Sequence, residues 1–265
     1  MTPALAHRLA GRPLLALLDV DGTLSPIADR PEHAIVPAAM RHTLTALVRQ
    51  SDTHVALLSG RSARDAARLV GVSGVWVIGN HGIEIAAPNE PAVPRADVAE
   101  YVDRITEALV RCNAVADSAP GVVVEDKRWT LSVHYRLADR AIVPAISAHV
   151  ASIAQALGLR LTVGKEVLEL RPPVDVNKGT AALQLAESLS ALDLGASVLC
   201  IGDDRTDEDA FRALRERQPL AVTVFVGGYG DAVGTAAEFH VEDPDEVRAL
   251  LETIVEQRSE VRNSG

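Results

Sequence analysis

The sequence predicts an α/β fold in which a parallel sheet forms the core and a smaller α/β domain is inserted into it. Short apolar runs that end in polar residues recur along the chain and are typical of parallel strands buried on both faces. Between residues 95 and 171 apolar and polar residues alternate in places, which is typical of an antiparallel sheet with one solvated face. Proline-rich stretches flank this part, so we expect a core of residues 1–86 and 172–265 and an insert of residues 87–171.

Composition and charge limit the class of function. The chain has 265 residues, 48% of them hydrophobic, which suffices for a core and an insert, and its net charge is −10. The negative charge argues against nucleic acid or an anionic membrane as partner, but a small anionic substrate is compatible with a locally positive site. No apolar run suits a signal peptide or a membrane span, so we expect a cytoplasmic protein. Cys112 and Cys200 are expected to be buried thiols.

The first strand is expected at residues 14–18, after a short leader, and polar residues follow it at once. Asp19 and Asp21 lie where this strand should end, and Gly22 permits a sharp turn. A turn alone would explain Asp21-Gly22, but it gives no reason for Asp19 directly after a buried run. Two carboxylates so close at a strand end are costly without a cation, and ligands bind at such ends. This stretch therefore favours a site for magnesium and phosphate.

Two further strand ends carry polar residues. A strand at residues 54–58 ends in Ser59-Gly60-Arg61, just before a helix over residues 63–70. A hydroxyl beside a helix N-terminus suits phosphate binding, although capping of that helix would also explain the motif. A strand at residues 75–78 ends in Gly79-Asn80-His81-Gly82, whose glycines indicate special backbone angles or a close approach.

The insert is expected to be a half-solvated sheet with two helices. In its last strand Glu169 and Arg171 share one face, opposite Leu168 and Leu170. Solvent could cover the polar faces, but a substrate is at least as good an explanation because two of the few lysines lie in or beside them. We expect helices over residues 96–111 and 140–157 and strands at residues 122–124, 130–136, 159–163 and 166–171.

Lysine is scarce in this chain, with three residues against 23 arginines (26 minus 3). A compact, mobile ammonium therefore has a reason to be kept at Lys127, Lys165 and Lys178, although chance could also leave three. Lys178 opens a helix, at an end where the helix dipole disfavours a cation. This local misfit favours a functional lysine.

The returning core supplies the remaining groups. Strands are expected at residues 198–201 and 221–226, and the first of them ends in Gly202-Asp203-Asp204. Mg²⁺ prefers oxygen ligands, which the carboxylates of Asp19 and Asp203 and the backbone carbonyl of Asp21 can supply.

Phosphoryl transfer also needs partners for the phosphoryl oxygens, a nucleophile and a proton donor. Ser59 and Lys178 are suited to contact the phosphoryl oxygens, as a hydrogen-bonding and a cationic partner respectively. Asp19 is placed to attack phosphorus, and Asp21 to protonate the leaving alcohol and then deprotonate water.

On these residues the chain resembles the haloacid dehalogenase superfamily of phosphatases, whose four motifs match Asp19-Val20-Asp21-Gly22-Thr23-Leu24, Ser59, Lys178 and Gly202-Asp203-Asp204. More narrowly it resembles the trehalose-6-phosphate phosphatases. The matching segments are Ser59-Gly60-Arg61, Gly79-Asn80-His81-Gly82, Glu125-Asp126-Lys127, His134-Tyr135-Arg136, Gly164-Lys165, Glu169-Leu170-Arg171-Pro172 and Gly202-Asp203-Asp204-Arg205-Thr206-Asp207-Glu208. The resemblance implies a Rossmann-like core with an inserted α/β cap that recognises the sugar.

The resemblance also implies roles for particular residues. The cap would bind the disaccharide through Glu125, Lys127, Arg136, Lys165 and Glu169, with Arg61 and Asn80 as substrate contacts from the core. His81 is either a further substrate contact at the rim of the site or a structural residue of its loop. The Mg²⁺ site would involve Asp19, Asp21, Asp203, Asp204 and Asp207, of which Asp204 and Asp207 support the metal or orient Lys178.

The function expected from the sequence is Mg²⁺-dependent hydrolysis of trehalose 6-phosphate through an aspartyl-phosphate, by a monomer acting on a small molecule. Another sugar phosphatase, for sucrose phosphate or for mannosyl- or glucosyl-phosphoglycerate, is the alternative with the same chemistry. A sugar-phosphate sensor is the non-enzymatic alternative. Asp21 argues against the sensor, since a switch needs a long-lived phosphoaspartate. A P-loop kinase is disfavoured because the chain lacks the Gly-x4-Gly-Lys-Ser/Thr motif.

Overall fold

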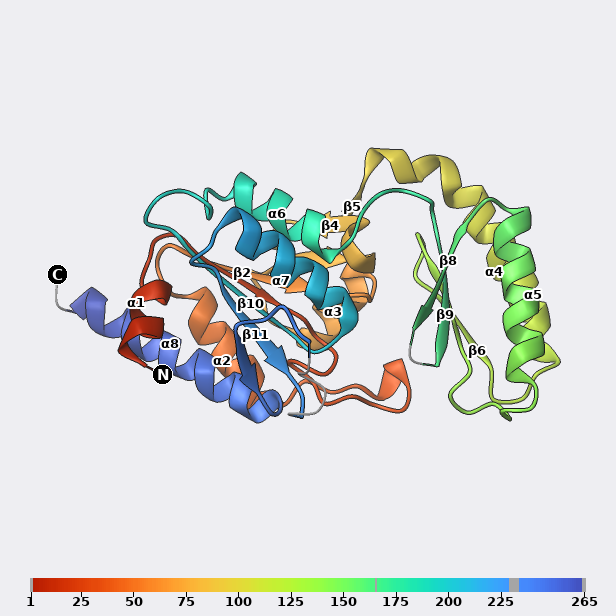
Figure 1. Cartoon of the computed structure of the whole chain (residues 1–265), viewed down its shortest axis with the longest axis horizontal. Helices are drawn as coiled ribbons and strands as arrows, with labels where there is room; N and C mark the ends of the chain where they lie inside the picture. Colours follow the sequence, from red (N-terminus) through yellow and green to blue (C-terminus); the bar gives the residue numbers. More distant parts are fainter. Residues whose placement is uncertain (1, 165, 229–233, 264–265) are drawn as a thin grey trace. The chain divides into compact units, whose positions relative to one another are not determined.

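The structure, a computed structural model, describes residues 2–164, 166–228 and 234–263 of the chain. Contacts within the chain divide it into two compact units (Figure 1). We call Met1–Val93 with Val176–Gly265 the core unit and Pro94–Asp175 the insert unit.

The core unit is built on one sheet with the strand order β12-β11-β10-β1-β2-β3-β4-β5 in the described part of the chain. Neighbouring strands from β12 to β3 are parallel, and β4 runs antiparallel to β3. Apolar residues fill β1 and β10 because both faces of these central strands are covered. The strands are β1 (Leu14–Leu18), β2 (Thr53–Leu58), β3 (Trp76–Gly79), β4 (Glu84–Ala86), β5 (Val93–Pro94), β10 (Ser197–Gly202), β11 (Val222–Val226) and β12 (Phe239–Val241).

Helices cover both faces of this sheet, and each face has its own apolar cluster. The cluster on one face includes residues of α2, α3 and α8, and the cluster on the other face includes residues of α6 and α7 (Figure 1). The helices of the unit are α1 (Pro3–Leu9), α2 (Ala38–Val48), α3 (Ala63–Val70), α6 (Lys178–Ser188), α7 (Arg205–Arg217) and α8 (Pro244–Asn263), with 3₁₀ turns at Pro31–His33 and Asn80–Gly82. The core is thus a three-layer α/β structure, as the sequence predicts.

The five predicted core strands are confirmed, and their bounds differ from the prediction by at most one residue at each end. The sequence does not predict β4, β5 or β12, and the stretch from Ala86 to Pro94, which holds β5 and the last residue of β4, has the composition of a linker. Each of the three is two or three residues long, which is too short for a periodic pattern to reveal. The expected leader also forms α1, whose N-terminus is capped by the hydroxyl of Thr2.

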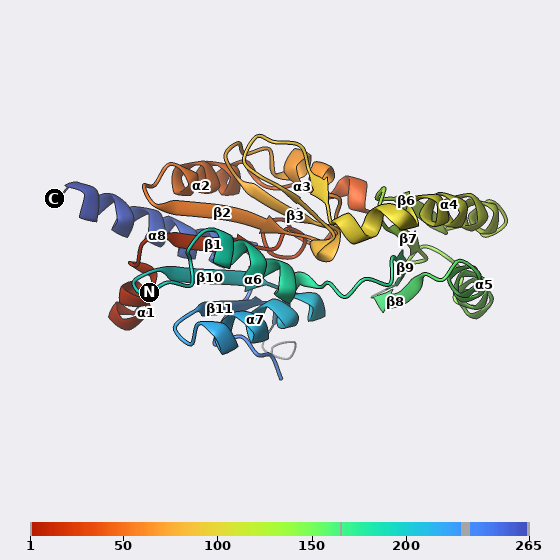
Figure 2. The same ribbon diagram turned by 90° about the horizontal axis from the view of Figure 1, so that it is seen from above.

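The insert unit holds an antiparallel sheet of order β6-β7-β9-β8, with α4 and α5 packed on one face (Figure 2). Leu168 and Leu170 belong to the apolar cluster with these helices, so Glu169 and Arg171 point to the opposite face, as predicted. The elements are a 3₁₀ turn at Ala96–Tyr101, α4 (Val102–Asp117), β6 (Val123–Asp126), β7 (Leu131–His134), α5 (Val143–Ala156), β8 (Arg160–Gly164) and β9 (Val167–Arg171). In the described part of the chain, no helix is both long and apolar enough to span a membrane.

Arg258 on α8 is a buried arginine that joins three distant segments of the core unit. Its guanidinium donates hydrogen bonds to the carbonyls of Leu9 and Gly11 at 3.2 and 3.1 Å and to that of Asp52 at 3.1 Å. It also donates to the hydroxyl of Thr53 at 3.0 Å. Burial lowers the pKa of Arg258, so these acceptors stabilise a desolvated charge.

We expect Arg258→Ala to lower the free energy of unfolding by about 3 kcal/mol, because the carbonyls of Leu9, Gly11 and Asp52 lose a charged donor. Urea unfolding would measure this loss. Arg248→Ala on the same helix is the control: it removes a solvent-screened ion pair with Glu252 and should cost much less stability. Equal losses in the two variants would contradict a stabilising role for Arg258.

Candidate active site

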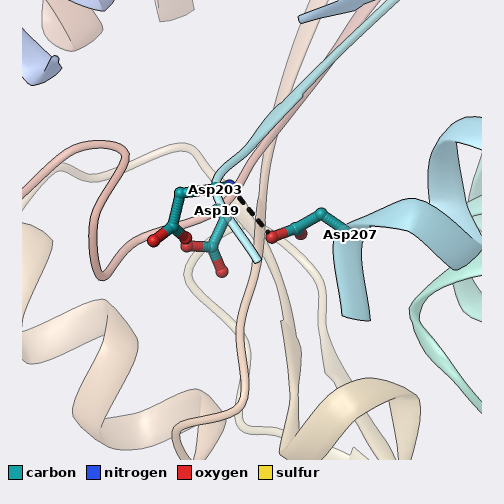
Figure 3. A group of neighbouring side chains, drawn as sticks. All are labelled: Asp19, Asp203 and Asp207. Atoms are coloured by element: carbon teal, nitrogen blue, oxygen red, sulfur yellow. Dashed lines mark hydrogen bonds between the residues drawn. The ribbon is translucent and has the colours of Figure 1, made fainter. Parts of the chain in front are cut away.

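The site begins where the two central strands end. β1 and β10 are parallel neighbours, and the amide of Asp19 continues their ladder by donating to the carbonyl of Ile201 at 2.9 Å. Asp19 and Asp203 therefore emerge side by side at the carboxyl edge of the sheet (Figure 3). Gly22 is required beside them, since a Cβ there would lie 2.0 Å from an oxygen of Asp203 and its φ is +86°.

Lys178 neutralises part of this acidic edge. It is the first residue of α6, whose N-terminus is closed by a capping box between Asn177 and Thr180. The buried ammonium donates to Asp19 Oδ1 at 2.7 Å and to Asp207 Oδ1 at 2.8 Å. Two carboxylates thus offset the unfavourable helix dipole at this position.

Asp207 and Asp204 organise the start of α7. Asp204 is the N-cap and accepts from the amides of Thr206 and Asp207. Asp207 Oδ2 accepts from the amides of Asp203 and Asp204, both at 3.2 Å, while its Oδ1 accepts from Lys178. Both oxygens of Asp207 are therefore engaged with the protein, which suits a supporting role.

A second group of predicted residues lies at the ends of β1 and β2. Arg61 donates from Nε and Nη2 to the two oxygens of Asp21, both at 2.6 Å, and this bidentate pair is the observed partner of Asp21. Ser59 is buried, and its hydroxyl accepts from the amide of Arg61 at 3.1 Å. The resemblance implies that Arg61 is a substrate contact, whereas here its guanidinium orients a carboxylate of the core.

The acidic edge holds more negative charge than Lys178 can balance. Burial, followed by repulsion from Asp207 and Asp204, raises the pKa of Asp203 to about 8. Burial also raises the pKa of Asp19 and of Asp207 well above the ordinary value, against the opposing attraction of Lys178. One oxygen from each of Asp19, Asp203 and Asp207 lies within 4.8 Å of the other two. A divalent cation would offset the mutual repulsion of these clustered, desolvated carboxylates, and carboxylate oxygens are ligands that such a cation prefers. The residues therefore fit a metal ion.

We expect the metal-free protein to lose stability as pH rises from 6 to 8.5. The pKa of Asp203 is about 8 when folded and about 3.9 in an unfolded chain, so the folded state holds an extra proton at pH 6 and loses it as the pH rises through 8. A metal must displace that proton at pH 6 but not at pH 8.5. At one fixed Mg²⁺ concentration, the rise in melting temperature should therefore be larger at pH 8.5. An equal rise at both pH values would contradict this prediction.

The predicted residues Asn80 and His81 form a turn beside Ser59. Both have left-handed backbone angles, with φ of 51° and 55°. The His81 ring packs on Gly60, where a Cβ would lie 2.6 Å from it, which explains the glycine in Ser-Gly-Arg. Their contacts within the core unit thus place these two residues next to the catalytic candidates.

In the insert unit three of the predicted sugar contacts, Glu125, Lys127 and Glu169, lie together on the polar face of the sheet. Lys127 Nζ is 3.3 Å from Glu169 Oε1 and 3.9 Å from Glu125 Oε2. Arg136 forms an ion pair with Glu166 at 2.8 Å. Lys165 lies outside the described residues.

Two residues to which the sequence assigns no role of their own lie in these networks. His134 Nε2 lies 2.8 Å from Glu125 Oε2 on the polar face of the insert unit. Glu84 is buried behind the Asn80-His81 turn. Both leave a signal in the sequence, since His134 lies in a polar position of an alternating strand and Glu84 interrupts the apolar pair Ile83 and Ile85.

The fold and the acidic strand ends define the chain as a haloacid dehalogenase-like α/β protein. A haloacid dehalogenase-like hydrolase from Bacteroides thetaiotaomicron, 17% identical, has the same fold with a TM-score of 0.61 over 92% of this chain and 99% of that one. The family model for trehalose-phosphatase matches residues 17–245. The chain therefore belongs to the trehalose-phosphatase family.

Two relatives narrow the comparison. A trehalose-phosphate phosphatase of Mycobacterium avium (strain 104) is 38% identical over 254 residues, which are 95% of this chain and 64% of that protein. The chain thus spans just under two thirds of the length of this relative. The crystal structure of a trehalose-6-phosphate phosphatase related protein superposes with a TM-score of 0.79 at 27% identity, over 91% of this chain and 97% of that one.

Proposed function

We propose that this protein is a phosphoric monoester hydrolase that converts trehalose 6-phosphate to trehalose and phosphate, a step of trehalose biosynthesis. The observation that carries the proposal is the buried contact of Lys178 with Asp19 and Asp207 beside Asp203, in a chain of the trehalose-phosphatase family. The names of the mycobacterial and structural relatives support the choice of sugar phosphate.

The core unit supplies the groups for phosphoryl transfer. Ser59 and Lys178 bind the phosphoryl oxygens, and Asp19 attacks phosphorus. The bond from phosphorus to the sugar oxygen breaks, and Asp21 gives that oxygen a proton. Asp21 then takes a proton from water, whose oxygen attacks the phosphorus of the aspartyl-phosphate and releases inorganic phosphate and the Asp19 carboxylate.

Mg²⁺ is the proposed metal, and the carboxylates of Asp19 and Asp203 would hold it together with the backbone carbonyl of Asp21. Both oxygens of Asp207 already accept hydrogen bonds, and Asp204 caps α7, so these two act as supports. Arg61 donates to both side-chain oxygens of Asp21, which leaves the backbone carbonyl as the oxygen that Asp21 would offer a metal. When bound, Mg²⁺ supplies charge neutralisation for the phosphoryl group.

The insert unit is proposed to be the cap that recognises the sugar, with the boundaries expected near residues 87 and 171. Its polar face combines carboxylates and an ammonium at Glu125, Lys127 and Glu169, and such groups hydrogen-bond sugar hydroxyls. Arg136 and Lys165 stay predicted contacts. The monomeric state and the cytoplasmic location also stay predictions.

We expect Glu169→Ala to raise KM for trehalose 6-phosphate about tenfold or more, because a charged hydrogen-bonding partner of the sugar is lost. KM for p-nitrophenyl phosphate, which lacks the sugar, should hardly change. Steady-state kinetics on both substrates measure the split. Glu107→Ala on α4 removes an exposed carboxylate of the same unit and serves as control. An equal loss on both substrates would exclude a role in sugar binding.

The deciding experiment is phosphate release from a panel of sugar phosphates, with Mg²⁺ and with EDTA. A strong preference for trehalose 6-phosphate that EDTA abolishes would support both units' proposed roles. Activity that is broad, or that favours sucrose phosphate or a phosphoglycerate conjugate, would keep the core chemistry and reject the substrate. No release from any substrate would favour the sensor.

A further inference from the structure

Glu84 is a buried carboxylate that no step of the proposed reaction uses. It is 6% exposed at the start of β4, whereas its neighbour Ile85 is 36% exposed. The strand thus turns its acid inward and an apolar side chain outward, which reverses the ordinary pattern. Such local departures are expected at functional or strained sites.

The carboxylate joins two segments. Glu84 Oε1 accepts from the amide of Ala63, the first residue of α3, at 2.8 Å, and from the side-chain amide of Asn80 at 2.8 Å. Helix α3 already has an N-cap, since the hydroxyl of Ser62 accepts from the amide of Asp65. Capping of α3 therefore does not explain why Glu84 also accepts a hydrogen bond from Asn80.

Asn80 in turn fixes the backbone of the Ser-Gly-Arg turn. The backbone amide of Asn80 donates to the carbonyl of Arg61 at 2.7 Å, and the backbone amide of His81 donates to the carbonyl of Ser59 at 3.0 Å. Both donors can point this way because Asn80 and His81 have left-handed backbone angles. Left-handed angles in two successive non-glycine residues are unfavourable and persist only where surrounding contacts hold them.

We infer that Glu84 is a positioning residue for the reaction. It holds Asn80, Asn80 holds the backbone of Arg61, and the guanidinium of Arg61 holds both oxygens of Asp21. This series of contacts orients the carboxylate that transfers the proton. The inference rests on the proposed function, in which Asp21 is the acid and base.

Three variants test the inference. Glu84→Ala removes the acceptor, and Glu84→Asp is too short to reach both donors. Each should lower kcat for p-nitrophenyl phosphate by up to about 10²-fold with KM little changed, because a small misplacement of reacting groups is costly. Glu84→Gln keeps an oxygen acceptor for both donors and should retain kcat within about threefold of the wild type.

Ser197→Ala is the matched control. Ser197 lies at the start of β10, at the opposite end of the strand from Asp203. Its hydroxyl donates to the carbonyl of Arg8 at 2.6 Å and accepts from the amide of Gly11 at 2.9 Å. This variant also loses two hydrogen bonds of a buried side chain, so its melting temperature should fall while kcat stays unchanged.

Hydrogen exchange supplies a readout that does not need activity. The backbone amides of Ala63 and Asn80 should exchange faster in Glu84→Ala and Glu84→Asp than in the wild type. In Glu84→Gln they should exchange at the wild-type rate. The inference is overturned if these amides stay protected, if Glu84→Asp keeps full kcat, or if Glu84→Gln loses as much as Glu84→Asp. An inactive wild type with the expected exchange would reject the proposed function and leave Glu84 as the residue that orders this turn.

Discussion

Asp19→Asn is expected to lower phosphate release from trehalose 6-phosphate by about 10³-fold or more, because an amide cannot act as the nucleophile. The fold should survive this change. Asp19 is buried beside Asp203, burial raises its pKa, and the amide removes one desolvated charge without changing the shape of the side chain. The melting temperature is therefore expected to equal that of the wild type or to exceed it.

The control for this variant is Asp193→Asn, which makes the same chemical change at an exposed position before β10. It should leave both the rate and the melting temperature unchanged. Rates would be measured on purified, folded protein with Mg²⁺ present. An Asp19→Asn variant that keeps near-wild-type activity would rule out the covalent mechanism.

Lys178→Met is expected to lower both activity and stability. The substitution keeps an unbranched side chain, one atom shorter, but leaves Asp19 and Asp207 buried without their cation. Removing one partner of a buried ion pair costs about 3–5 kcal/mol, and losing a charged donor to the phosphoryl group should cost at least about 10²-fold in rate. Because the orphaned carboxylates can take up protons, the loss of stability should be larger at pH 8 than at pH 6.

Urea unfolding of the metal-free protein at the two pH values measures this effect. Arg12→Met is the comparison, since Arg12 makes an exposed ion pair with Asp52 at 3.1 Å, just before the start of β1 and at the opposite end of that strand from Asp19. That change should cost about 1 kcal/mol or less and leave the rate unchanged. If Lys178→Met were as stable as the wild type at pH 8, the charge balance described for this cluster would be wrong.

The strand ends illustrate how far the sequence leads. Continuous apolar runs predict β1 and β10, and parallel strands end at a common edge, so the pattern of residues is enough to place Asp19 and Asp203 together. The same reasoning fails at β4, a three-residue strand without a periodic pattern. For that reason the sequence does not predict a role for Glu84, although this residue interrupts the apolar pair Ile83 and Ile85.

The order of residues is enough to predict the fold class, the chemical groups at the strand ends and the family resemblance. The pairing of those groups depends on how the chain folds. Lys178 meets Asp19 across 159 residues, and Arg61 meets Asp21 across 40. Local pattern reports which face of an element a residue occupies, but a contact between distant residues depends on how helices and turns pack against the sheet. For this reason the hydrogen bonds that Arg61 donates to Asp21 and that Asn80 donates to Glu84 are visible only in the folded chain.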